Sequence, residues 1–184
     1  MSKLSIVTHN TDKVKEFKEL VGFDIGIIDF DIPEVQALDV KEVAVYKAQV
    51  AYQETGKLSI VEDTGLYIDA WNGLPGAFTR WFLEALGVSG ICRVLNAEEN
   101  RKSYIKTVIV LHGDRILETF TGVLEGEILY EPRGENGFGF DSIFCPKNSQ
   151  KSLAEMTIQE KNTISTRRKT MDVLKEYITK HNLV

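Results

Sequence analysis

The sequence has few residues that could bind a soft metal or form disulfides. Only two cysteines occur among its 184 residues, and they do not have the spacing of a zinc site or a redox motif. The three histidines are scattered along the chain and form no zinc cluster. These absences leave room for a hard metal bound by oxygen atoms. We expect Cys92 and Cys145 to be small buried hydrophobic residues.

The sequence also lacks an excess of positive charge and a long uncharged apolar run. The formal net charge is -5 and the pI is about 5.3, which argues against a broad surface for duplex DNA or RNA. No apolar stretch is long enough to span a bilayer, and residues 1–5 lack the apolar region of a secretory signal. We therefore expect a cytoplasmic protein that binds neither nucleic acid polymers nor membranes.

What is present is the composition of an ordinary globular protein. Hydrophobic residues make up 43% and charged residues 27% of the chain, so disordered and fibrous classes are excluded. The length is sufficient to bury a core without disulfides. We expect a single domain over residues 1–184, with no internal repeat, linker or low-complexity tract.

Hydrophobic spacing predicts strands and helices in alternation. Asp39 is expected to cap a helix that ends at Gly56. Thr157 and Glu160 match a capping box at the start of one final helix, whose apolar face carries Ile164, Met171, Leu174 and Ile178. The expected strands are 4–7, 24–32, 58–61, 66–71, 104–112, 115–124 and 127–130; the other expected helices are 13–21, 78–86 and 88–95; the expected loops are 72–76 and 131–142.

Three widely separated segments carry polar and glycine residues that packing alone does not require. Residues 8–13 supply hydroxyl, amide and ammonium donors after an apolar run, and residues 61–65 place two carboxylates after another. Residues 134–141 alternate glycines with two aromatic rings. Phosphates need donors and cations, Mg²⁺ needs carboxylate oxygens, and a purine needs a flat apolar face. Together the segments favour a nucleoside triphosphate site with a magnesium ion, although no P-loop motif is present.

Each of these features also has an ordinary structural interpretation. Asp63 could be a helix cap or a surface turn residue. Outside the three segments, Glu34 follows Pro33 in an expected loop and by itself would be an exposed glutamate. Phe138 and Phe140 could belong to a glycine-containing turn with one ring in the core. Residue types alone leave these alternatives open. The apolar side chains of Trp81, Phe82 and Leu86 could face the core or a partner, and we expect them in the core.

In this order the motifs resemble the inosine triphosphate pyrophosphatase family, which hydrolyses non-canonical purine nucleoside triphosphates. The resemblance covers nearly the whole chain and includes five blocks. These blocks are residues 8–17, 61–66, 72–76, 134–141, and 160–162 together with Ser165 and Arg167.

The resemblance implies an α/β fold with an elongated mixed β-sheet flanked by helices, two lobes with a central cleft, and a homodimer. It implies a reaction in which water attacks the alpha phosphate and releases nucleoside monophosphate and pyrophosphate. The implied substrates are deaminated purine nucleotides such as ITP, dITP and XTP, and the implied cofactor is Mg²⁺, with Mn²⁺ as an alternative.

The resemblance also assigns roles to individual residues. Asp63 is the general base and, with Glu34, a metal ligand, although a metal-bound carboxylate is a weaker base. Glu62 has a supporting role and should point to the opposite side of the strand from Asp63. The implied substrate-binding residues are Thr8, His9, Asn10, Thr11, Asp12, Lys13, Lys47, Thr64, Phe138, Gly139, Phe140, Asp141, Lys161, Thr166 and Arg167.

Two of these positions depart from the family pattern. Thr166 stands where a histidine is more frequent, and His9 stands where a glycine is common. Both changes bear on base selectivity more than on the class of reaction. They leave two alternatives open, namely a pyrophosphatase of altered base preference and a nucleotide-binding sensor with little turnover.

Overall fold

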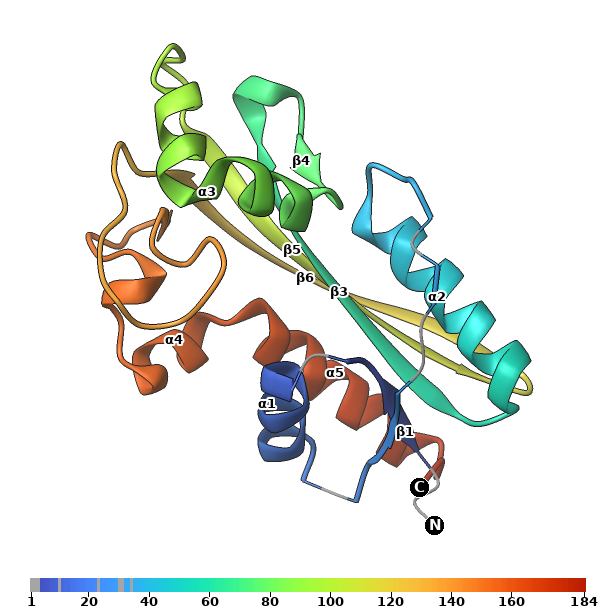
Figure 1. Cartoon of the computed structure of the whole chain (residues 1–184). Coiled ribbons are helices and arrows are strands. Elements are labelled where there is room, and N and C mark those ends of the chain that lie inside the picture. Colours follow the sequence, from blue (N-terminus) through green and yellow to red (C-terminus); the bar gives the residue numbers. More distant parts are fainter. Residues whose placement is uncertain (1–3, 10, 23, 30–31, 34) are drawn as a thin grey trace. The chain divides into compact units, whose positions relative to one another are not determined.

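The computed structural model describes residues 4–9, 11–22, 24–29, 32–33 and 35–184 (Figure 1). Its contacts divide the chain into two compact units. Unit 1 is Met1–Asp63, Thr107–Gly122 and Arg167–Val184, and unit 2 is Thr64–Lys106 and Val123–Thr166. The predicted single domain over residues 1–184 stays a prediction.

A seven-stranded mixed sheet confirms the expected α/β fold class. The strand order is β2-β1-β3-β5-β6-β7, and β4 pairs with β3 outside this order. β1 is parallel to β2 and β3, whereas β4 is antiparallel to β3 and β7 is antiparallel to β6. The strands are β1 Ser5–Val7, β2 Gly26–Ile28, β3 Ser59–Ile68, β4 Pro75–Gly76, β5 Lys102–Gly113, β6 Ile116–Ile128 and β7 Phe144–Pro146.

Unit 1 has a core formed by helices α1 (Thr11–Val21) and α5 (Thr166–Lys180) against β1 and β3. The two helices lie together on one side of these strands, and α2 (Val40–Thr55) lies on the other (Figure 1). Asp39 caps α2 through a hydrogen bond from the Lys41 amide, and Gly56 ends it in the left-handed conformation, as predicted. The buried residues of this core are Leu4, Ile6, Phe17, Val21, Ile25, Ile60, Ile109, Leu111, Phe120, Met171, Leu174 and Ile178.

Unit 2 has its own core, in which helix α3 (Thr79–Leu95) covers strands of the sheet (Figure 1). The predicted break between two helices is confirmed, because Gly87 has non-helical backbone angles inside α3. Cys92 and Cys145 are buried and unbonded, as expected. The buried residues are Leu66, Ile68, Ile91, Cys92, Leu95, Ile105, Ile128, Ile143, Phe144, Leu153 and Met156.

Two strand predictions were wrong in the same way. The strands expected at 58–61 and 66–71 are one strand, β3, which continues through Glu62 and Asp63 and ends before the 3-10 turn Asp69–Trp71. The strand expected at 127–130 is the end of β6. Charged residues normally mark the end of a buried strand, but here the carboxylates have cationic partners, so the strand can continue. β2 is also shorter than the expected 24–32.

The single final helix was also a wrong prediction. Ser165 leaves the helical conformation, so the segment forms two helices, α4 (Ile158–Ile164) and α5. The capping box of Thr157 and Glu160 is confirmed at the start of α4. Ile164 packs against the core of unit 2 and Met171 belongs to the core of unit 1, so they do not share one helix face.

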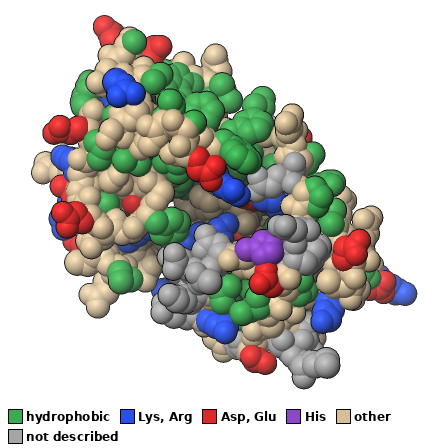
Figure 2. Space-filling view, viewed as in Figure 1, with side chains coloured by type: hydrophobic (Ala, Val, Ile, Leu, Met, Phe, Trp, Pro, Cys, Tyr) green, Lys and Arg blue, Asp and Glu red, His purple; other side chains and the backbone are tan. Residues whose placement is uncertain are grey.

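Trp81, Phe82 and Leu86 in α3 were expected in the core. This expectation is confirmed only for Phe82, which packs against the core of unit 2. Trp81 is 51% exposed and Leu86 is 38% exposed. Hydrophobic side chains accordingly gather on the visible surface over α3 and β4 (Figure 2). No helix within the described residues is long and apolar enough to cross a membrane.

Candidate functional site

In unit 1 the candidate site is built on consecutive residues of β3. Side chains alternate across a strand, so Glu62 and Asp63 point to opposite faces of the sheet, as predicted. The cationic partners of Glu62 come from α1 and α5, whereas that of Asp63 comes from α2. One strand therefore supplies a carboxylate to each face.

Glu62 is the centre of a buried cluster with two cations. Its side chain is 1% exposed. The Arg167 guanidinium donates from Nε to Oε2 at 2.5 Å and from Nη2 to Oε1 at 3.0 Å, a bidentate arrangement. The Lys13 ammonium lies 3.2 Å from Oε1 and donates to the Glu62 carbonyl at 3.1 Å. The expected cations Lys13 and Arg167 are therefore brought together by one carboxylate.

The protonation state of Glu62 follows from competing effects. Burial raises the pKa of the Glu62 carboxyl, but the charges and hydrogen bonds of Lys13 and Arg167 outweigh it and lower this pKa from 4.5 to about 2. Among the contacts that the structure describes, the cluster combines one carboxylate with two cationic side chains. Its net charge suits an anionic ligand.

Asp63 forms an ion pair with Lys47, whose ammonium lies 2.9 Å from Oδ2. Lys47 projects from the middle of α2, where the buried residues Ala44, Ala48 and Ala51 allow the helix to lie close to its neighbours. The Asp63 side chain is 20% exposed, so its oxygens are within reach of solvent. The predicted general base and one predicted phosphate-binding lysine are therefore direct neighbours.

The loop between β1 and α1 contains several predicted substrate contacts. The Thr8 amide donates to the Ile28 carbonyl, and the His9 ring contacts the Asp29 carboxylate through Nδ1. Thr8 and His9 thus tie the loop to β2 and to the residue that follows it. Asn10, a predicted substrate contact, lies outside the described residues, and Thr11 and Asp12 are described only as the start of α1.

The metal assignment can be examined only at Asp63, because Glu34 lies outside the described residues. The partly exposed Asp63 carboxylate is a hard oxygen ligand, and Mg²⁺ is commonly held by one or two carboxylates together with substrate phosphates. The donor chemistry therefore fits the ion. Within the described part of the chain, no group of three or more His, Cys, Asp or Glu residues forms a metal site by itself.

In unit 2 the glycine-rich loop is organised around Asp141. This buried carboxylate accepts a hydrogen bond from the Phe138 amide at 2.9 Å and one from the Lys161 ammonium at 2.6 Å. The same ammonium lies 5.3 Å from the centre of the Phe138 ring, a cation–π distance. Asp141 therefore connects the loop to helix α4, which carries Lys161.

Two glycines make this loop possible. Gly137 has φ +82°, and a Cβ atom there would lie 2.2 Å from the Asp141 carboxylate. Gly134 has φ +83°, and a Cβ atom there would lie 2.4 Å from the backbone of Ala154. Only glycine tolerates both the conformation and the close approach.

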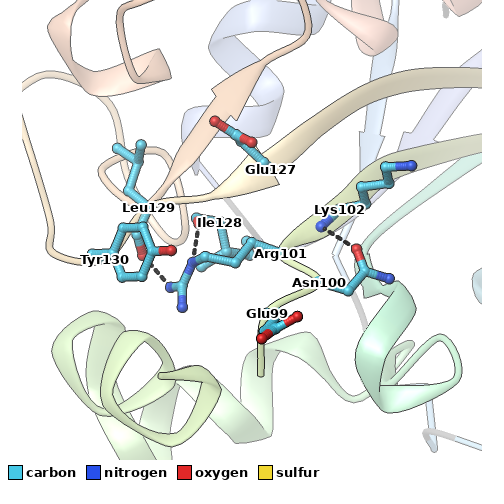
Figure 3. Close-up of a pocket in the computed structure, with 8 residues that line it drawn as sticks. All are labelled: Glu99, Asn100, Arg101, Lys102, Glu127, Ile128, Leu129 and Tyr130. Atoms are coloured by element: carbon cyan, nitrogen blue, oxygen red, sulfur yellow. Dashed lines mark hydrogen bonds between the residues drawn. The ribbon is translucent and has the colours of Figure 1, made fainter. Parts of the chain in front are cut away.

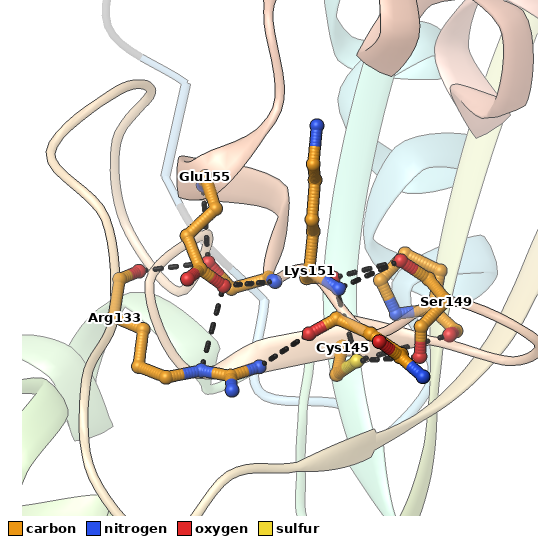
Figure 4. Close-up of polar contacts among 8 residues, drawn as sticks. Arg133, Cys145, Ser149, Lys151 and Glu155 are labelled. Carbon is orange, nitrogen blue, oxygen red and sulfur yellow. Dashed lines mark hydrogen bonds and ion pairs between the residues drawn. The ribbon is translucent and has the colours of Figure 1, made fainter.

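A second set of polar contacts joins the start of the loop to residues 149–155 (Figure 4). The Ser152 hydroxyl donates to the Arg133 carbonyl at 2.7 Å, and Glu155 accepts from the Ser152 amide at 2.7 Å. Arg133 in turn lies 3.4 Å from Glu155 and donates to the Gln150 carbonyl at 2.9 Å. The start of the loop is thus attached to the short 3-10 helix Leu153–Glu155.

The two loop phenylalanines have different surroundings. Phe138 is 47% exposed, whereas Phe140 packs against the core of unit 2. This division is the one expected of a ring that contacts a ligand and a ring that supports the loop. Thr166, the first residue of α5, is buried, and Thr64 is partly buried within β3.

A pocket of about 530 Å³ in unit 2 contains none of the predicted site residues (Figure 3). It is lined by the start of β5 and the end of β6 with their flanking residues. Its guanidinium group, from Arg101, is buried and donates to the carbonyls of Leu95, Ile128 and Leu129. Arg101 also stacks on the Tyr130 ring at 4.2 Å. These contacts make Arg101 a structural residue, so we do not place the functional site here.

Comparison with known proteins identifies the family. A sequence profile of the Ham1 family matches residues 4–177. The chain belongs to the Ham1 family. It is 38% identical to the dITP/XTP pyrophosphatase of Methanopyrus kandleri, with 95% of each chain covered. It is 37% identical to inosine triphosphate pyrophosphatase 1 of Trypanosoma cruzi, with 95% of this chain and 91% of the relative covered. The resemblance inferred from the sequence is thereby confirmed.

Solved structures of Ham1 proteins share the fold. The HAM1 protein of Coxiella burnetii matches with a TM-score of 0.88 and 33% identity. The match covers 98% of this chain and 100% of the Coxiella burnetii chain. The Staphylococcus aureus Ham1 protein matches with a TM-score of 0.85 and 27% identity, covering 97% and 100%.

Sequence reasoning gave Glu62 a supporting role but named no partner for it. The structure pairs it with two of the predicted cations, Lys13 and Arg167. The signal was present in the sequence, because an acidic pair inside a run of strand-forming residues places one carboxylate on a face that should be apolar.

Proposed function

We propose that this Ham1 protein hydrolyses ITP, dITP and XTP to the nucleoside monophosphate and pyrophosphate, and so removes non-canonical purine nucleotides. Its relatives named dITP/XTP pyrophosphatase and inosine triphosphate pyrophosphatase support this reaction over nearly the full chain. The observation that carries the proposal in the structure is the pairing of Asp63 with Lys47 beside the Lys13, Glu62 and Arg167 cluster on the same strand.

Unit 1 residues perform the phosphate chemistry in this proposal. The triphosphate would have to be reached from both faces of β3, by Lys47 beside Asp63 and by Lys13 and Arg167 beside Glu62, and these cations offset its charge. Asp63 accepts a proton from the attacking water as the oxygen forms its bond to the alpha phosphorus. The bond from that phosphorus to the bridging oxygen breaks, and pyrophosphate leaves. Lys47 holds the Asp63 carboxylate in one orientation, which favours a productive geometry.

Mg²⁺ is the proposed cofactor, with Mn²⁺ as a substitute. Asp63 would hold it together with Glu34 and the substrate phosphates, and the bound ion would neutralise charge that develops on the leaving pyrophosphate. The fit of the Asp63 carboxylate to a hard cation supports this assignment.

Unit 2 residues recognise the base in this proposal. The exposed ring of Phe138 would stack on a purine, and Lys161 would contribute a further positive charge. Thr166 would face the purine 6-position with a hydroxyl in place of the imidazole more frequent in the family. The proposal also includes a homodimer and a cytoplasmic location. Sedimentation analysis of the purified chain tests whether it is a dimer.

The decisive experiment is a panel of nucleoside triphosphates with monophosphate and pyrophosphate quantified separately. We expect equal amounts of both products from ITP, dITP and XTP with Mg²⁺. Asp63→Asn should lower kcat by about two to three orders of magnitude, because the base and one metal ligand are lost together. Glu125→Gln, which removes an exposed carboxylate, is the matched control and should leave kcat unchanged. Equal rates for Asp63→Asn and wild type would refute the role of Asp63.

The same panel distinguishes the alternative functions. A wider base preference is favoured by the short, buried hydroxyl of Thr166, which cannot reproduce the hydrogen bonds of a histidine. In that case ATP or a modified pyrimidine triphosphate would be hydrolysed at a rate comparable to ITP. Tight ITP binding without pyrophosphate release, with either Mg²⁺ or Mn²⁺, would instead indicate a nucleotide sensor.

A further inference from the structure

Glu62 has a carboxylate that takes no part in the proposed chemistry. Two of its described partners come from the first turns of different helices, Lys13 from α1 and Arg167 from α5. In sequence, Lys13 is 49 residues and Arg167 is 105 residues from Glu62. One side chain of β3 therefore determines where two distant helices place their cations.

A carboxylate at this position is costly for the fold. A side chain that points into the interior of unit 1 from a strand would normally be apolar, and burial of an ion requires compensating partners. Well-packed hydrophobic residues often stabilise a core as much as a buried ion pair does. The cluster is therefore poorly explained by stability alone.

The geometry of the contacts is restrictive. The two bonds from Nε and Nη2 of Arg167 to the Glu62 oxygens fix the plane of the guanidinium group. The Lys13 ammonium is held by both the carboxylate and the carbonyl of Glu62. Without the negative charge, the two cations would repel each other in a region shielded from water.

We infer that Glu62 is a positioning residue, which holds the Lys13 ammonium and the Arg167 guanidinium at the spacing that phosphate groups of the substrate require. The inference rests on the proposed function, because it assumes that these cations bind the triphosphate. Glu62 itself contacts the cations and not the substrate.

The direction of a binding change distinguishes this role from a simple charge effect. If Glu62 only lowered the local charge, its removal would make the site more positive and strengthen the binding of an anion. If it positions the cations, its removal releases them and binding becomes weaker. The two explanations predict opposite signs for the same variant.

The test uses inorganic tripolyphosphate, which has the phosphate chain but no base, in titration calorimetry with the full chain. Glu62→Gln keeps the shape and removes the charge, and we expect Kd to increase on the order of tenfold because the cations are misplaced. Glu62→Asp keeps the charge on a shorter side chain, and we expect a smaller increase in Kd. In ITP hydrolysis, KM should rise more than kcat falls for both variants.

Two controls separate positioning from loss of charge and loss of stability. Glu125→Gln removes the same charge from an exposed site and should leave the Kd unchanged. Ile60→Val removes a buried methyl group from the same strand and should lower the Tm without changing the Kd.

Unchanged or tighter binding in Glu62→Gln would overturn the inference. If Glu62→Gln does not fold, Glu62→Asp decides, since a Kd equal to that of wild type would refute positioning. Failure of the wild type to release pyrophosphate would refute the proposed function alone, because tripolyphosphate binding is measured independently of turnover. Wild-type protein that releases pyrophosphate from ITP but binds no tripolyphosphate would refute the inference alone.

Discussion

The two units place charged groups by different means. In unit 1, Lys13, Lys47 and Arg167 project from helices of 11 to 16 residues and meet carboxylates on one strand. In unit 2, Asp141 lies in a glycine-rich loop, and its partner Lys161 projects from a helix of only seven residues. Regular elements thus hold the first group of charges, and a loop shaped by glycine holds the second.

The difference indicates what kind of change would disrupt the charged groups of each unit. In unit 1 the arrangement depends on the ionisation of a buried carboxylate, because two cations converge on Glu62. In unit 2 it depends on backbone conformation, because the loop follows a path that only glycine can take at Gly134 and Gly137. Substitutions and changes of pH should therefore affect the two units differently.

The largest effect is expected in the loop of unit 2, for Gly134→Ala. The new Cβ would lie 2.4 Å from the Ala154 backbone, at a φ of +83°, so both strain and collision oppose the native loop. We expect a loss of about 3 to 4 kcal/mol in the free energy of unfolding, measured by urea denaturation.

Gly56→Ala is the matched control in unit 1. This glycine also has a positive φ of +60°, but nothing lies within 4 Å of an added Cβ. Only the conformational cost remains, about 1 kcal/mol. Equal losses for the two variants would show that the crowding at Gly134 relaxes, and the contrast between the units would be wrong.

The next effect is the acid sensitivity of unit 1. The pKa of Glu62 is lowered from 4.5 to about 2 in the folded state, so above pH 4.5 the ionised carboxylate contributes fully to the free energy of unfolding. This contribution, about 3 kcal/mol relative to the protonated carboxyl, is lost as the pH falls from 4.5 towards 2. Urea denaturation across this pH range measures it.

Glu62→Gln provides the comparison for this pH dependence. The variant cannot titrate at this position, so its stability should fall less steeply over the same range. Parallel curves for wild type and Glu62→Gln would mean that other carboxyl groups cause the acid sensitivity.

A smaller effect should separate the two phenylalanines of the unit 2 loop. Phe140→Leu removes contacts with the core and should cost about 1 kcal/mol of stability. Phe138→Leu affects an exposed ring and should change stability by less than about 0.5 kcal/mol. Phe138→Leu should weaken the binding of ITP more than that of tripolyphosphate. The reverse pattern would assign the stacking ring to Phe140.

The smallest effect is expected for the exposed pair of Glu125 and Lys147. The hydrogen bond from Lys147 lowers the pKa of the Glu125 carboxyl, but both side chains are largely exposed. Solvent screens such pairs, so Lys147→Gln should leave the urea midpoint unchanged. A clear shift would mean that surface pairs contribute to stability here as buried ones do.

Local signals in the sequence were sufficient for much of the fold. The helix cap at Asp39, the stop at Gly56 and the capping box at Thr157 each depend on a few neighbouring residues, and each is confirmed. The continuation of β3 through Glu62 depends on cations that lie far away in the sequence. The last helix breaks at Ser165, between Ile164 at the core of unit 2 and Met171 in the core of unit 1.

Short-range patterns and motifs in the chain were enough to predict the alternation of strands and helices, the family, and the residue types available for phosphate and metal chemistry. Which charges meet became visible in the folded structure. Glu62 joins Lys13 and Arg167, Asp63 joins Lys47, and Asp141 joins Lys161. The physical reason is that the cost of a buried charge depends on its partners in space, and those partners are set by the packing of the whole chain.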